Sequence, residues 1–466
     1  MSKAHFALGL LLALVACSDN VAPPIASGDG GASSSSGGDA KVDAPVSCDP
    51  ATDPSCVDEK QGLFVDVAKG ADGNDGTKAS PLKSISGALG KLGSKTRVYV
   101  CAGAYPGSLA IKNPVAIYGG FTCEDWKAGG GKVTIVGETD YGVDISAANV
   151  TLSDVEIQAP ASSAQNVNSI AARVVGVDGV VFRRAKLIAK DGFNSATGVL
   201  TSFTTFPAQA DLDGANASGA TGGDKPAASC PGGKTSKGGK GGDNGFTGAN
   251  GDPAAVGGTG GQMASCGAGG TGLDGKTGVM GGAGTAAATF GTLKDGAWLP
   301  AAGGPGEVGG PGGGGGGGLG FGGGGGGQGG AGGCGGAGGG GGQGGGASIA
   351  LLLASAGASL TSTSLVSGKG GDGGPGVTGQ AGQVIFGGAG TKVGVGGCNG
   401  GSGAPGGQGG GGAGGAGGLS AGIVFFGKAP VVNDTPTVKG AGGGAGKGAA
   451  SNDGLAGDAK DIYEAK

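Results

Sequence analysis

Short apolar runs recur along this chain, each followed by a turn, a short strand-like run and a second apolar pair that leads into glycine. The clearest copy is residues 169–192 (SIAARVVGVDGVVFRRAKLIAKDG), which returns at 348–370, more loosely at 420–442, and upstream at 141–160. A repeat of about 20–24 residues with several short strands per unit is typical of a β-solenoid, in which one unit forms one coil. The pattern therefore predicts an all-β solenoid.

The four copies align on one position of the pattern, and on a second position five residues later. The first position holds Leu152, Phe182, Leu360 and Val432. The second holds Ile157, Leu187, Leu365 and Thr437. We expect the units 169–192, 348–370 and 420–442 to stack as consecutive coils with the first position lined up inside, although a long segment separates the first two units.

Upstream of these copies the pattern predicts a strand, a helix and further strands. Residues 63–67 (LFVDV) alternate as a strand does. Ser80 is a suitable N-cap and Pro81 a suitable first-turn residue, so a helix is predicted over residues 81–92. Its apolar positions at helical spacing are Leu82, Ile85, Leu89 and Leu92, and Gly93 follows as a stop signal. Strand-like runs then come at 98–101, 109–111 and 115–118.

At this point the residues carry a family resemblance. FVDVAKGADGNDGTKASPLKSISGAL, followed by VYVCAGAYPGSLAIKNPVAIYGGF, resembles the N-terminal part of right-handed parallel β-helix proteins of the pectin-lyase-like superfamily. The resemblance covers residues 63–192 and implies a right-handed parallel β-helix whose N-terminal helix covers the open apolar end of the solenoid. It is specific for the fold and not for an activity.

Glycine dominates residues 213–346 and 369–418, and 33 of the 44 residues in 303–346 are Gly. In composition these tracts resemble the PE-PGRS-like glycine-rich surface proteins of mycobacteria and glycine-rich tracts in predicted myxobacterial lipoproteins. Each long tract leaves the repeat after the same point, at Gly192 and at Gly370. Insertions at one point of a repeat emerge on one side of the stack, so we expect glycine loops to project there.

Disorder is the expected state of these tracts. Fixing 44 backbones costs on the order of 44–88 kcal/mol, and the tract 303–346 has almost no side chains to bury. The alternative is a packed array of extended, threefold polyproline-II-like glycine strands, whose backbones can approach closely and bond to one another.

The N-terminus resembles a bacterial lipoprotein signal. Lys3 precedes an apolar run, 6–16, that is too short to span a bilayer, and Leu14-Val15-Ala16-Cys17 matches a lipobox. The resemblance implies that Cys17 is lipidated and holds the protein to a membrane of the cell envelope. Ser18 after it implies an outer-membrane address. The Ser/Gly/Ala/Asp/Pro-rich segment that follows predicts a flexible tether.

These observations divide the chain into eight predicted segments. They are a signal peptide (1–16), the lipidated cysteine and tether (17–47), an N-terminal β-helix with its capping helix (48–206), a glycine-rich insertion (207–346), a β-helix coil (347–368), a second insertion (369–419), a further coil (420–442) and a glycine-rich tail (443–466).

Cysteine content agrees with export. Apart from Cys17 there are eight cysteines, and an even number in an exported chain predicts disulfides. The simplest pairing joins neighbours in the sequence: Cys48–Cys56, Cys101–Cys123, Cys230–Cys266 and Cys334–Cys398. Zinc binding is the competing interpretation, but no CxxC pair occurs and the single histidine, His5, lies in the signal.

Several functions are excluded by composition. A net charge of −4 and only four arginines provide no positively charged surface to attract the phosphates of a nucleic acid. Without a histidine after the signal, neither a Ser-His-Asp nor a Cys-His nucleophile can be assembled. The glycine tracts contain no GxxxxGK[ST] phosphate loop, and no cofactor is expected.

Two groups of residues remain as candidates for chemistry. Asp72, Asn74 and Asp75 lie in a DGNDG run that resembles a calcium loop, although it lacks the closing glutamate of an EF-hand, and such runs usually form turns. A charged cluster contains Arg183, Arg184, Lys186, Lys190 and Asp191. Polysaccharide lyases with a β-helix fold use an Arg or Lys base with carboxylate-held calcium.

A solvated outward face is the other interpretation of the charged cluster, since charges alternate there with apolar residues. With Leu152 and Phe182 matched, Asp154 falls beside Arg184 and Glu156 beside Lys186. Each carboxylate would then face a basic side chain one strand spacing away, about 4.8 Å, which makes ordinary surface ion pairs.

The sequence thus favours a non-catalytic, lipid-anchored cell-envelope protein with a structural, adhesive or glycan-contacting role. Its partners would be the membrane, through the lipid, and an extracellular glycan or other surface proteins. The alternative is a polysaccharide lyase or hydrolase on the same fold. Few aromatic residues for sugar stacking, only 4% of the chain, favour the first.

Overall fold

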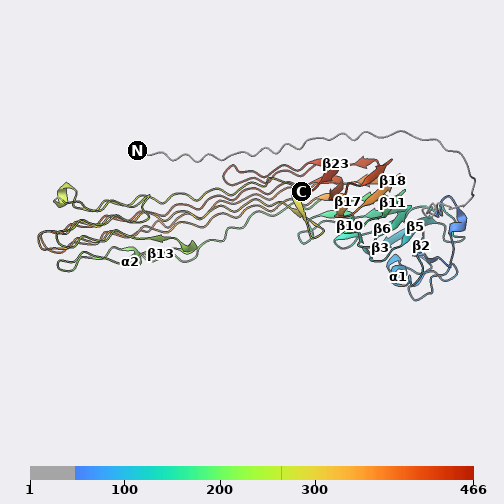
Figure 1. Cartoon of the computed structure of the whole chain (residues 1–466), viewed down its shortest axis with the longest axis horizontal. Helices are drawn as coiled ribbons and strands as arrows, with labels where there is room; N and C mark the ends of the chain where they lie inside the picture. Colours follow the sequence, from blue (N-terminus) through green and yellow to red (C-terminus); the bar gives the residue numbers. More distant parts are fainter. Residues whose placement is uncertain (1–47, 264) are drawn as a thin grey trace, which may run out of the picture. The chain divides into compact units, whose positions relative to one another are not determined.

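Three parallel sheets form a β-helix (Figure 1) around a common apolar core. In order, the first sheet contains β1 (Gly62–Val65), β2 (Arg97–Cys101), β5 (Ala116–Phe121), β8 (Thr151–Ser153), β11 (Val180–Arg183), β18 (Ala358–Thr361) and β21 (Val431–Asn433). The second contains β4 (Leu109–Ile111), β7 (Tyr141–Ile145), β10 (Ser169–Val175), β17 (Ser348–Ala354), β20 (Ser420–Phe426) and β23 (Ala459–Glu464). The third contains β3 (Gly103–Pro106), β6 (Val133–Val136), β9 (Val155–Gln158), β12 (Lys186–Ile188), β19 (Ser364–Val366) and β22 (Thr437–Val438). The predicted right-handed parallel β-helix is confirmed.

The structure is a computed structural model that describes residues 48–263 and 265–466. The predicted signal peptide, Cys17 and the tether up to residue 47 lie outside the described residues. Within the described part, no helix is long and apolar enough to cross a membrane.

The predicted stacking of the repeats is confirmed strand by strand. Phe182 pairs with Leu152 on one side and with Leu360 on the other, and all three side chains are fully buried. Val432 continues the same column, since it pairs with Leu360. It is nevertheless 39% exposed, which contradicts the expectation that it lies inside. The reason is that β21 is the last strand of its sheet, so no further coil covers Val432.

The N-terminal helix α1 (Ile85–Gly90) is shorter than the predicted range 81–92. Its N-cap is Ser84, whose hydroxyl accepts a hydrogen bond from the Gly87 N–H at 2.9 Å, and not Ser80. Leu82 is extended and forms a β-bridge with Val65, so the first residues of the predicted range, 81 and 82, cannot belong to the helix. The side chain of Ile85 is buried in the main core together with that of Leu82. The helix therefore covers the first coil, as the resemblance implied.

All three long excursions leave the β-helix at the same place, between the third sheet and the second. In the early coils this connection is short, at residues 107–108, 137–140 and 159–168. In the last three coils it becomes residues 189–347, 367–419 and 439–458. The expectation that the glycine tracts emerge at one point of the repeat is confirmed.

The glycine tracts form a hydrogen-bonded bundle of extended strands, which contradicts the expected disorder. Residues 303–318 run antiparallel to 327–342 and donate from every third N–H. The donor–acceptor pairs are Gly303–Gly342, Gly306–Gly339, Gly309–Gly336, Gly312–Gly333, Gly315–Gly330 and Gly318–Gly327, at 2.8–2.9 Å. These hydrogen bonds repeat every three residues, which is the period of a polyproline-II-like helix. The alternative prediction, a packed array of extended glycine strands, is therefore confirmed.

Each central strand of the bundle is bonded on several sides. The N–H of Gly316 donates to Leu273, that of Gly317 to Ala249, and that of Gly318 to Gly327. A Cβ atom built on Gly316 would overlap the carbonyl group of Thr259, on a different strand. Only glycine permits this spacing, so the bundle is held by backbone groups instead of by an apolar core.

The bundle continues the coils of the β-helix. Successive excursions pair in parallel through Gly192–Lys369, Ser195–Asp372 and Gly198–Pro375, and then through Gly370–Ala441, Gly373–Gly444 and Gly376–Lys447. The packed strands therefore begin at Gly192, upstream of the predicted boundary at 207. The predicted glycine-rich tail 443–466 also contains β23, which pairs with β20.

A short helix, two hairpins and 3-10 turns interrupt the excursions. They are α2 (Gln209–Leu212), the hairpin of β13 (Ala228–Ser229) and β14 (Thr235–Ser236), the hairpin of β15 (Gly291–Lys294) and β16 (Ala297–Pro300), and the 3-10 turns η2 (Pro231–Gly233) and η3 (Cys266–Ala268). Trp298 of β16 is buried against Ile349, Leu352 and Val424 on the outer face of the second sheet. This hairpin gives the β-helix a second apolar cluster outside its central core.

Two of the predicted disulfides are wrong. Cys230 is bonded to Cys334 and Cys266 to Cys398, instead of Cys230 to Cys266 and Cys334 to Cys398. The cause is the folding of the bundle, which places the strand of Cys334 beside that of Cys230. Cys48 and Cys56 are both disulfide-bonded, and their sulfur atoms lie within 4.8 Å of one another, as the predicted pairing requires.

The predicted bond between Cys101 and Cys123 is not formed. Both residues are thiols, although their sulfur atoms lie within 4.8 Å of one another and of a carboxylate oxygen of Asp66. Burial, together with the hydrogen bond to Cys123, raises the pKa of the Cys101 thiol. Cys101 ends β2 and Cys123 lies just after the neighbouring strand β5, so the fold brings the pair together but leaves it unlinked.

Candidate functional site

The charged cluster predicted around Arg183 lies at a turn that repeats from coil to coil. Arg184 follows β11 and has φ of 48°, in the left-handed region. The equivalent residues Asp154, Ser362 and Asp434 also have positive φ, at 60°, 48° and 48°. Because this turn breaks the alternation of the strand, the side chains of Arg183 and Arg184 reach the same side, where alternation alone predicts opposite faces.

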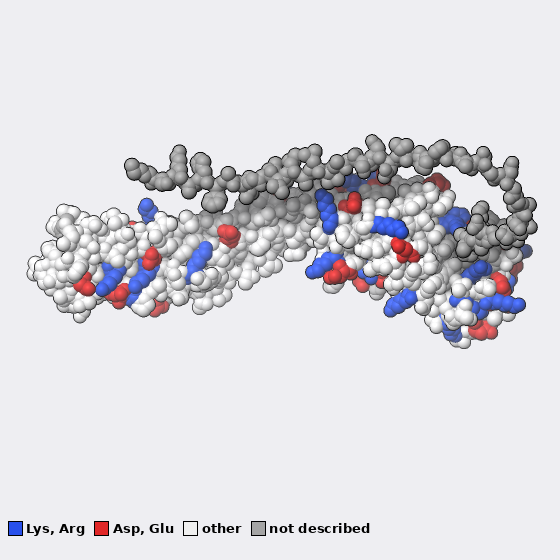
Figure 2. All heavy atoms as spheres, viewed as in Figure 1, with Lys and Arg blue, Asp and Glu red and all other residues white. Residues whose placement is uncertain are grey.

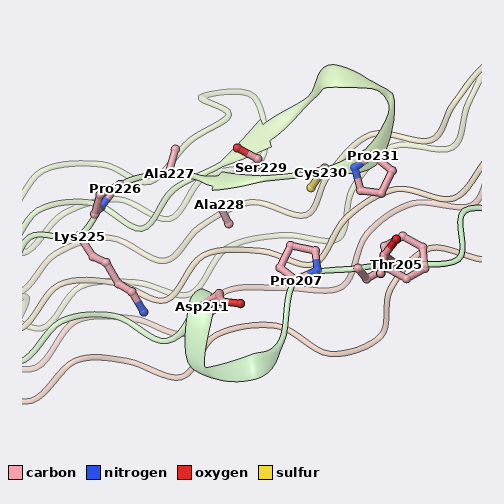
Figure 3. Close-up of a pocket in the computed structure, with 11 residues that line it drawn as sticks. Thr205, Pro207, Asp211, Lys225, Pro226, Ala227, Ala228, Ser229, Cys230 and Pro231 are labelled. Carbon is pink, nitrogen blue, oxygen red and sulfur yellow. The ribbon is translucent and has the colours of Figure 1, made fainter.

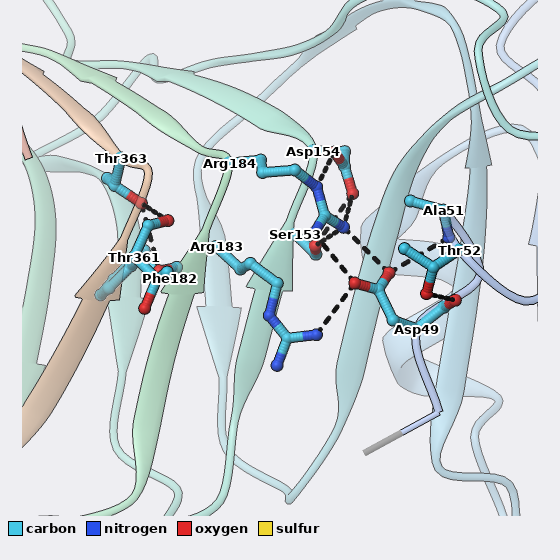
Figure 4. Close-up of polar contacts among 10 residues, drawn as sticks. All are labelled: Asp49, Ala51, Thr52, Ser153, Asp154, Phe182, Arg183, Arg184, Thr361 and Thr363. Carbon is cyan, nitrogen blue, oxygen red and sulfur yellow. Dashed lines mark hydrogen bonds and ion pairs between the residues drawn. The ribbon is translucent and has the colours of Figure 1, made fainter. Parts of the chain in front are cut away.

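Both arginines bind one carboxylate that the sequence did not place there. Arg184 holds Asp49 through Nη1 and Nη2, each at 2.9 Å, and Arg183 Nη1 lies 3.1 Å from Asp49 Oδ2 (Figure 4). Arg184 also holds Asp154 through Nε and Nη2 at 2.7 and 2.8 Å, and its Nη2 lies 3.0 Å from Ser153 Oγ. Such fork-to-fork pairs fix geometry as well as charge.

This cluster is less solvated than the expected outward face. The side chain of Asp49 is 13% exposed and that of Arg184 is 33% exposed. Burial acts to raise the pKa of Asp49, but hydrogen bonds from Arg184 and from the Ala51 N–H outweigh it, so that the pKa lies below its ordinary value. The hydrogen bond to Asp154 raises the pKa of Arg184 despite its burial. A guanidinium held in this way keeps its proton and is poorly suited to act as a base.

The predicted ion pairs between coils are confirmed. Arg184 pairs with Asp154 at 2.7 Å, and Lys186 pairs with Glu156 at 3.6 Å. Lys132 approaches Glu156 as well, at 3.7 Å.

The other charged residues of the predicted cluster have separate contacts. An Asp191 carboxylate oxygen accepts the N–H of Lys369 at 2.7 Å. Asp178, which the predicted cluster did not include, faces Lys428 at 3.4 Å. The backbone N–H of Lys190 donates to Ser169 Oγ at 2.9 Å. The carboxylates near Arg184 are thus distributed among cations and backbone donors, and none of these residues belongs to a group of potential metal ligands in the described part of the chain.

The predicted calcium candidates support turns and the capping helix. Asp72 accepts hydrogen bonds from the N–H groups of Lys83 and Ser84 at 3.0 and 2.9 Å, and from Ser84 Oγ at 2.8 Å. Asn74 donates to the Pro81 carbonyl at 2.8 Å, and Asp75 accepts from Thr77. These three residues do not form a ligand group among the residues described.

The bundle contains an open pocket of about 570 Å³ (Figure 3). It is lined by Thr205, Phe206, Pro207, Asp211, Lys225, Pro226, Ala227, Ala228, Ser229, Cys230 and Pro231. Its two charged side chains bind backbone groups of nearby residues. Asp211 accepts the Ala208 N–H at 3.3 Å, and Lys225 Nζ contacts the carbonyls of Ala210 and Asp213. The pocket thus offers an apolar wall and no pair of groups placed for acid–base chemistry.

The far end of the bundle is a set of turns that hold one another. The Gly323 N–H donates to Asn244 Oδ1 at 3.0 Å, and the Gly325 N–H donates to the Gly219 carbonyl at 2.9 Å. The disulfide Cys266–Cys398 links two further turns. We call this end, formed by the turns near residues 219, 245, 266, 322 and 395, the tip.

Bulky apolar side chains project from the tip. They are Phe246, Met263, Val393 and Val395, with exposed fractions of 68, 69, 37 and 97%. In Figure 2 the outermost part of the bundle is white, without charged side chains on the visible face. The members of this group are spread over 150 residues of sequence and come to one end of the bundle only through its packing, so the sequence pattern did not reveal them.

Comparisons with known proteins add little to this geometry. No protein-family model and no curated protein matches the chain. Two solved structures of the pectin methylesterase from Aspergillus niger, one deglycosylated and one penultimately deglycosylated, are similar to part of it. Their identities are 19% and 20%, each match covers 30% of this chain, and the TM-score is 0.21. The chain spans about half, 48%, of those solved chains, and a likeness at this level carries no argument about activity.

Proposed function

We propose that the protein is a non-catalytic, lipid-anchored protein of the bacterial cell envelope that presents a rigid polyglycine bundle with an adhesive tip. The observation that carries the proposal is the tip, where exposed Phe246, Met263 and Val395 stand on mutually bonded turns. Contiguous exposed apolar patches mark interaction sites, and these side chains are proposed to form one such patch. A bonded bundle holds them at a fixed place, whereas the flexible loops expected from composition would not.

The charged cluster supports a role without catalysis. A β-helix lyase needs a base close to the sugar and a cation held by carboxylates. Arg184 is held by Asp49 and Asp154, and Glu156 lies between Lys132 and Lys186. Incubation of the soluble protein with polygalacturonate and calcium should therefore yield no unsaturated products. Products that disappear in Arg184→Ala would favour the lyase alternative.

Membrane attachment is proposed from the lipobox, residues 14–17, which lies outside the described residues. The Cys17→Ser variant should move from the membrane fraction to the soluble fraction when cells are separated. Retention of the variant in the membrane would contradict the lipid anchor.

Adhesion by the tip can be tested with immobilised soluble protein. Surfaces coated with it should retain cells of the source bacterium, and replacement of Phe246, Met263 and Val395 by Ser should abolish retention. Matched control replacements are Val199→Ser and Val384→Ser, which are 76% and 74% exposed but lie outside the tip turns. Equal retention by tip and control variants, or no retention by the unchanged protein, would refute the adhesive role.

A further inference from the structure

The arginine pair beside β11 has the geometry of a carboxylate-binding site that the chain itself fills. Asp49 meets Arg183 and Arg184 with three hydrogen bonds of 2.9–3.1 Å, although about 134 residues of chain separate the partners. Two guanidinium groups that converge on one carboxylate provide the planar, charge-assisted recognition that arginine gives to carboxylates.

Arg184 is oriented independently of Asp49. Its Nε and Nη2 atoms are bonded to Asp154, and Nη2 also lies 3.0 Å from Ser153 Oγ, both on the neighbouring coil. Removal of the Asp49 side chain would leave this guanidinium in place and aimed at the vacated position. A preorganised donor of this kind loses little conformational entropy when it binds.

There is room beside this position. A pocket of about 270 Å³ is lined by Pro50 and Ala51, which follow Asp49, and by Tyr118, Gly120 and Asp154 of the β-helix, among others. Figure 4 shows Asp49 between the arginines and its own segment. The segment thus forms part of the wall of a pocket next to the arginine pair, and the Asp49 side chain occupies the arginine pair as an internal ligand.

We infer that Arg183 and Arg184 form a binding site for the carboxylate of a small organic acid, which the Asp49 side chain occupies in this structure. This inference is independent of the adhesive role, because it concerns a different part of the molecule. The probe that fits the chemistry is acetate, which offers the same two oxygens as the Asp49 side chain without the attached backbone.

Chemical rescue tests the site. The Asp49→Ala variant should unfold at a lower temperature than the unchanged protein at pH 7. Sodium acetate should restore at least half of that loss in a saturable manner, while sodium chloride at equal ionic strength should not. The unchanged protein should show no such rise, since Asp49 already fills the site. If Asp49→Ala does not fold, its refolding yield should rise with acetate and not with chloride.

Three further variants define the specificity of the rescue. Asp49→Asn fills the position with a neutral amide and should gain nothing from acetate. Asp53→Ala removes an exposed carboxylate that accepts the Ser55 N–H in the same segment, and should also be insensitive. Asp49→Ala combined with Arg183→Ala should lose the response. Equal effects of acetate and chloride on Asp49→Ala, in stability or in refolding yield, would overturn the inference.

Discussion

Phe182 and Leu360 lie side by side on the neighbouring strands β11 and β18, with the entire first glycine excursion between them in the sequence. Both side chains are fully buried. The coil is thus interrupted after β12 and resumes at β17 in the same register. The first end of the excursion also pairs with the next excursion, through Gly192 and Lys369, and its last end does so through Gly346 and Gly371. The bundle is therefore an extension of the coils and not a separate domain.

Leu360 and Val432 differ in burial, so truncating each to alanine should lower the free energy of unfolding by different amounts. Leu360→Ala removes a fully buried side chain and should lower the free energy of unfolding by about 2–5 kcal/mol. Val432→Ala, one coil further and 39% exposed, should cost about 1 kcal/mol or less. Urea unfolding of both variants measures the difference, and equal losses would contradict the position of Val432 at the uncovered end of its sheet.

A methyl group inside the bundle should be destabilising. Gly316→Ala would drive a Cβ atom into the carbonyl group of Thr259, and overpacking of this kind costs about 1–3 kcal/mol or more. The matched control is Gly267→Ala, because a Cβ there meets no atom within 4 Å. Thermal unfolding should separate the two variants. If Gly316→Ala were as stable as Gly267→Ala, the strands could not be packed this closely.

The disulfides link segments of the bundle that are far apart in the sequence. Nonreducing peptide mapping should find Cys230 linked to Cys334 and Cys266 linked to Cys398. The first closes a loop of about 100 residues, so Cys230→Ser with Cys334→Ser should cost up to about 4–5 kcal/mol in the chain-entropy model. Recovery of a Cys230–Cys266 peptide would mean that the hairpins of the bundle are arranged differently.

Stability should depend on pH through Asp49. Its pKa in the folded protein lies below the ordinary 3.8, because the hydrogen bonds from Arg184 outweigh burial. The unfolded chain therefore binds this proton more tightly, so the stabilisation is complete well above pH 3.8 and is lost as the pH falls through the folded value. Asp49→Asn should cost about 1–3 kcal/mol at pH 7. In denaturant titrations this difference from the unchanged protein should shrink as the pH falls below 3.8, and a constant difference would contradict the role of the ionised carboxylate.

The β-helix could be predicted because its signal is periodic. Apolar positions recur once per coil, so aligning Leu152 with Phe182 also placed Asp154 beside Arg184. The contact with Asp49 could not be found in this way, since that residue lies outside the repeats. The capping helix was predicted too long because Ser80 and Ser84 are both acceptable N-caps, and the bridge from Leu82 to Val65 decides between them.

The order of the glycine tracts could not be predicted from side chains, because few are present. The entropic cost of fixing the backbone favoured disorder in the prediction. That estimate left out the hydrogen bonds that closely packed backbones form with one another. Gly316, Gly317 and Gly318 each donate to a different strand, and their lack of a Cβ allows those strands to approach. The disulfide pairs depend on the same packing, which explains why pairing by sequence neighbours failed for Cys334 and Cys398.

The measurement that tests this account most directly is hydrogen exchange of the tract 303–346, followed by mass spectrometry. In the packed bundle the N–H groups of residues 312–318 are all bonded to other strands, so their amides should exchange about a thousandfold more slowly than in an unstructured chain. Peptides from β17 serve as an internal control for folded protein. Complete exchange of 312–318 within seconds, while β17 stays protected, would show that the glycine tracts are disordered and that no rigid bundle exists.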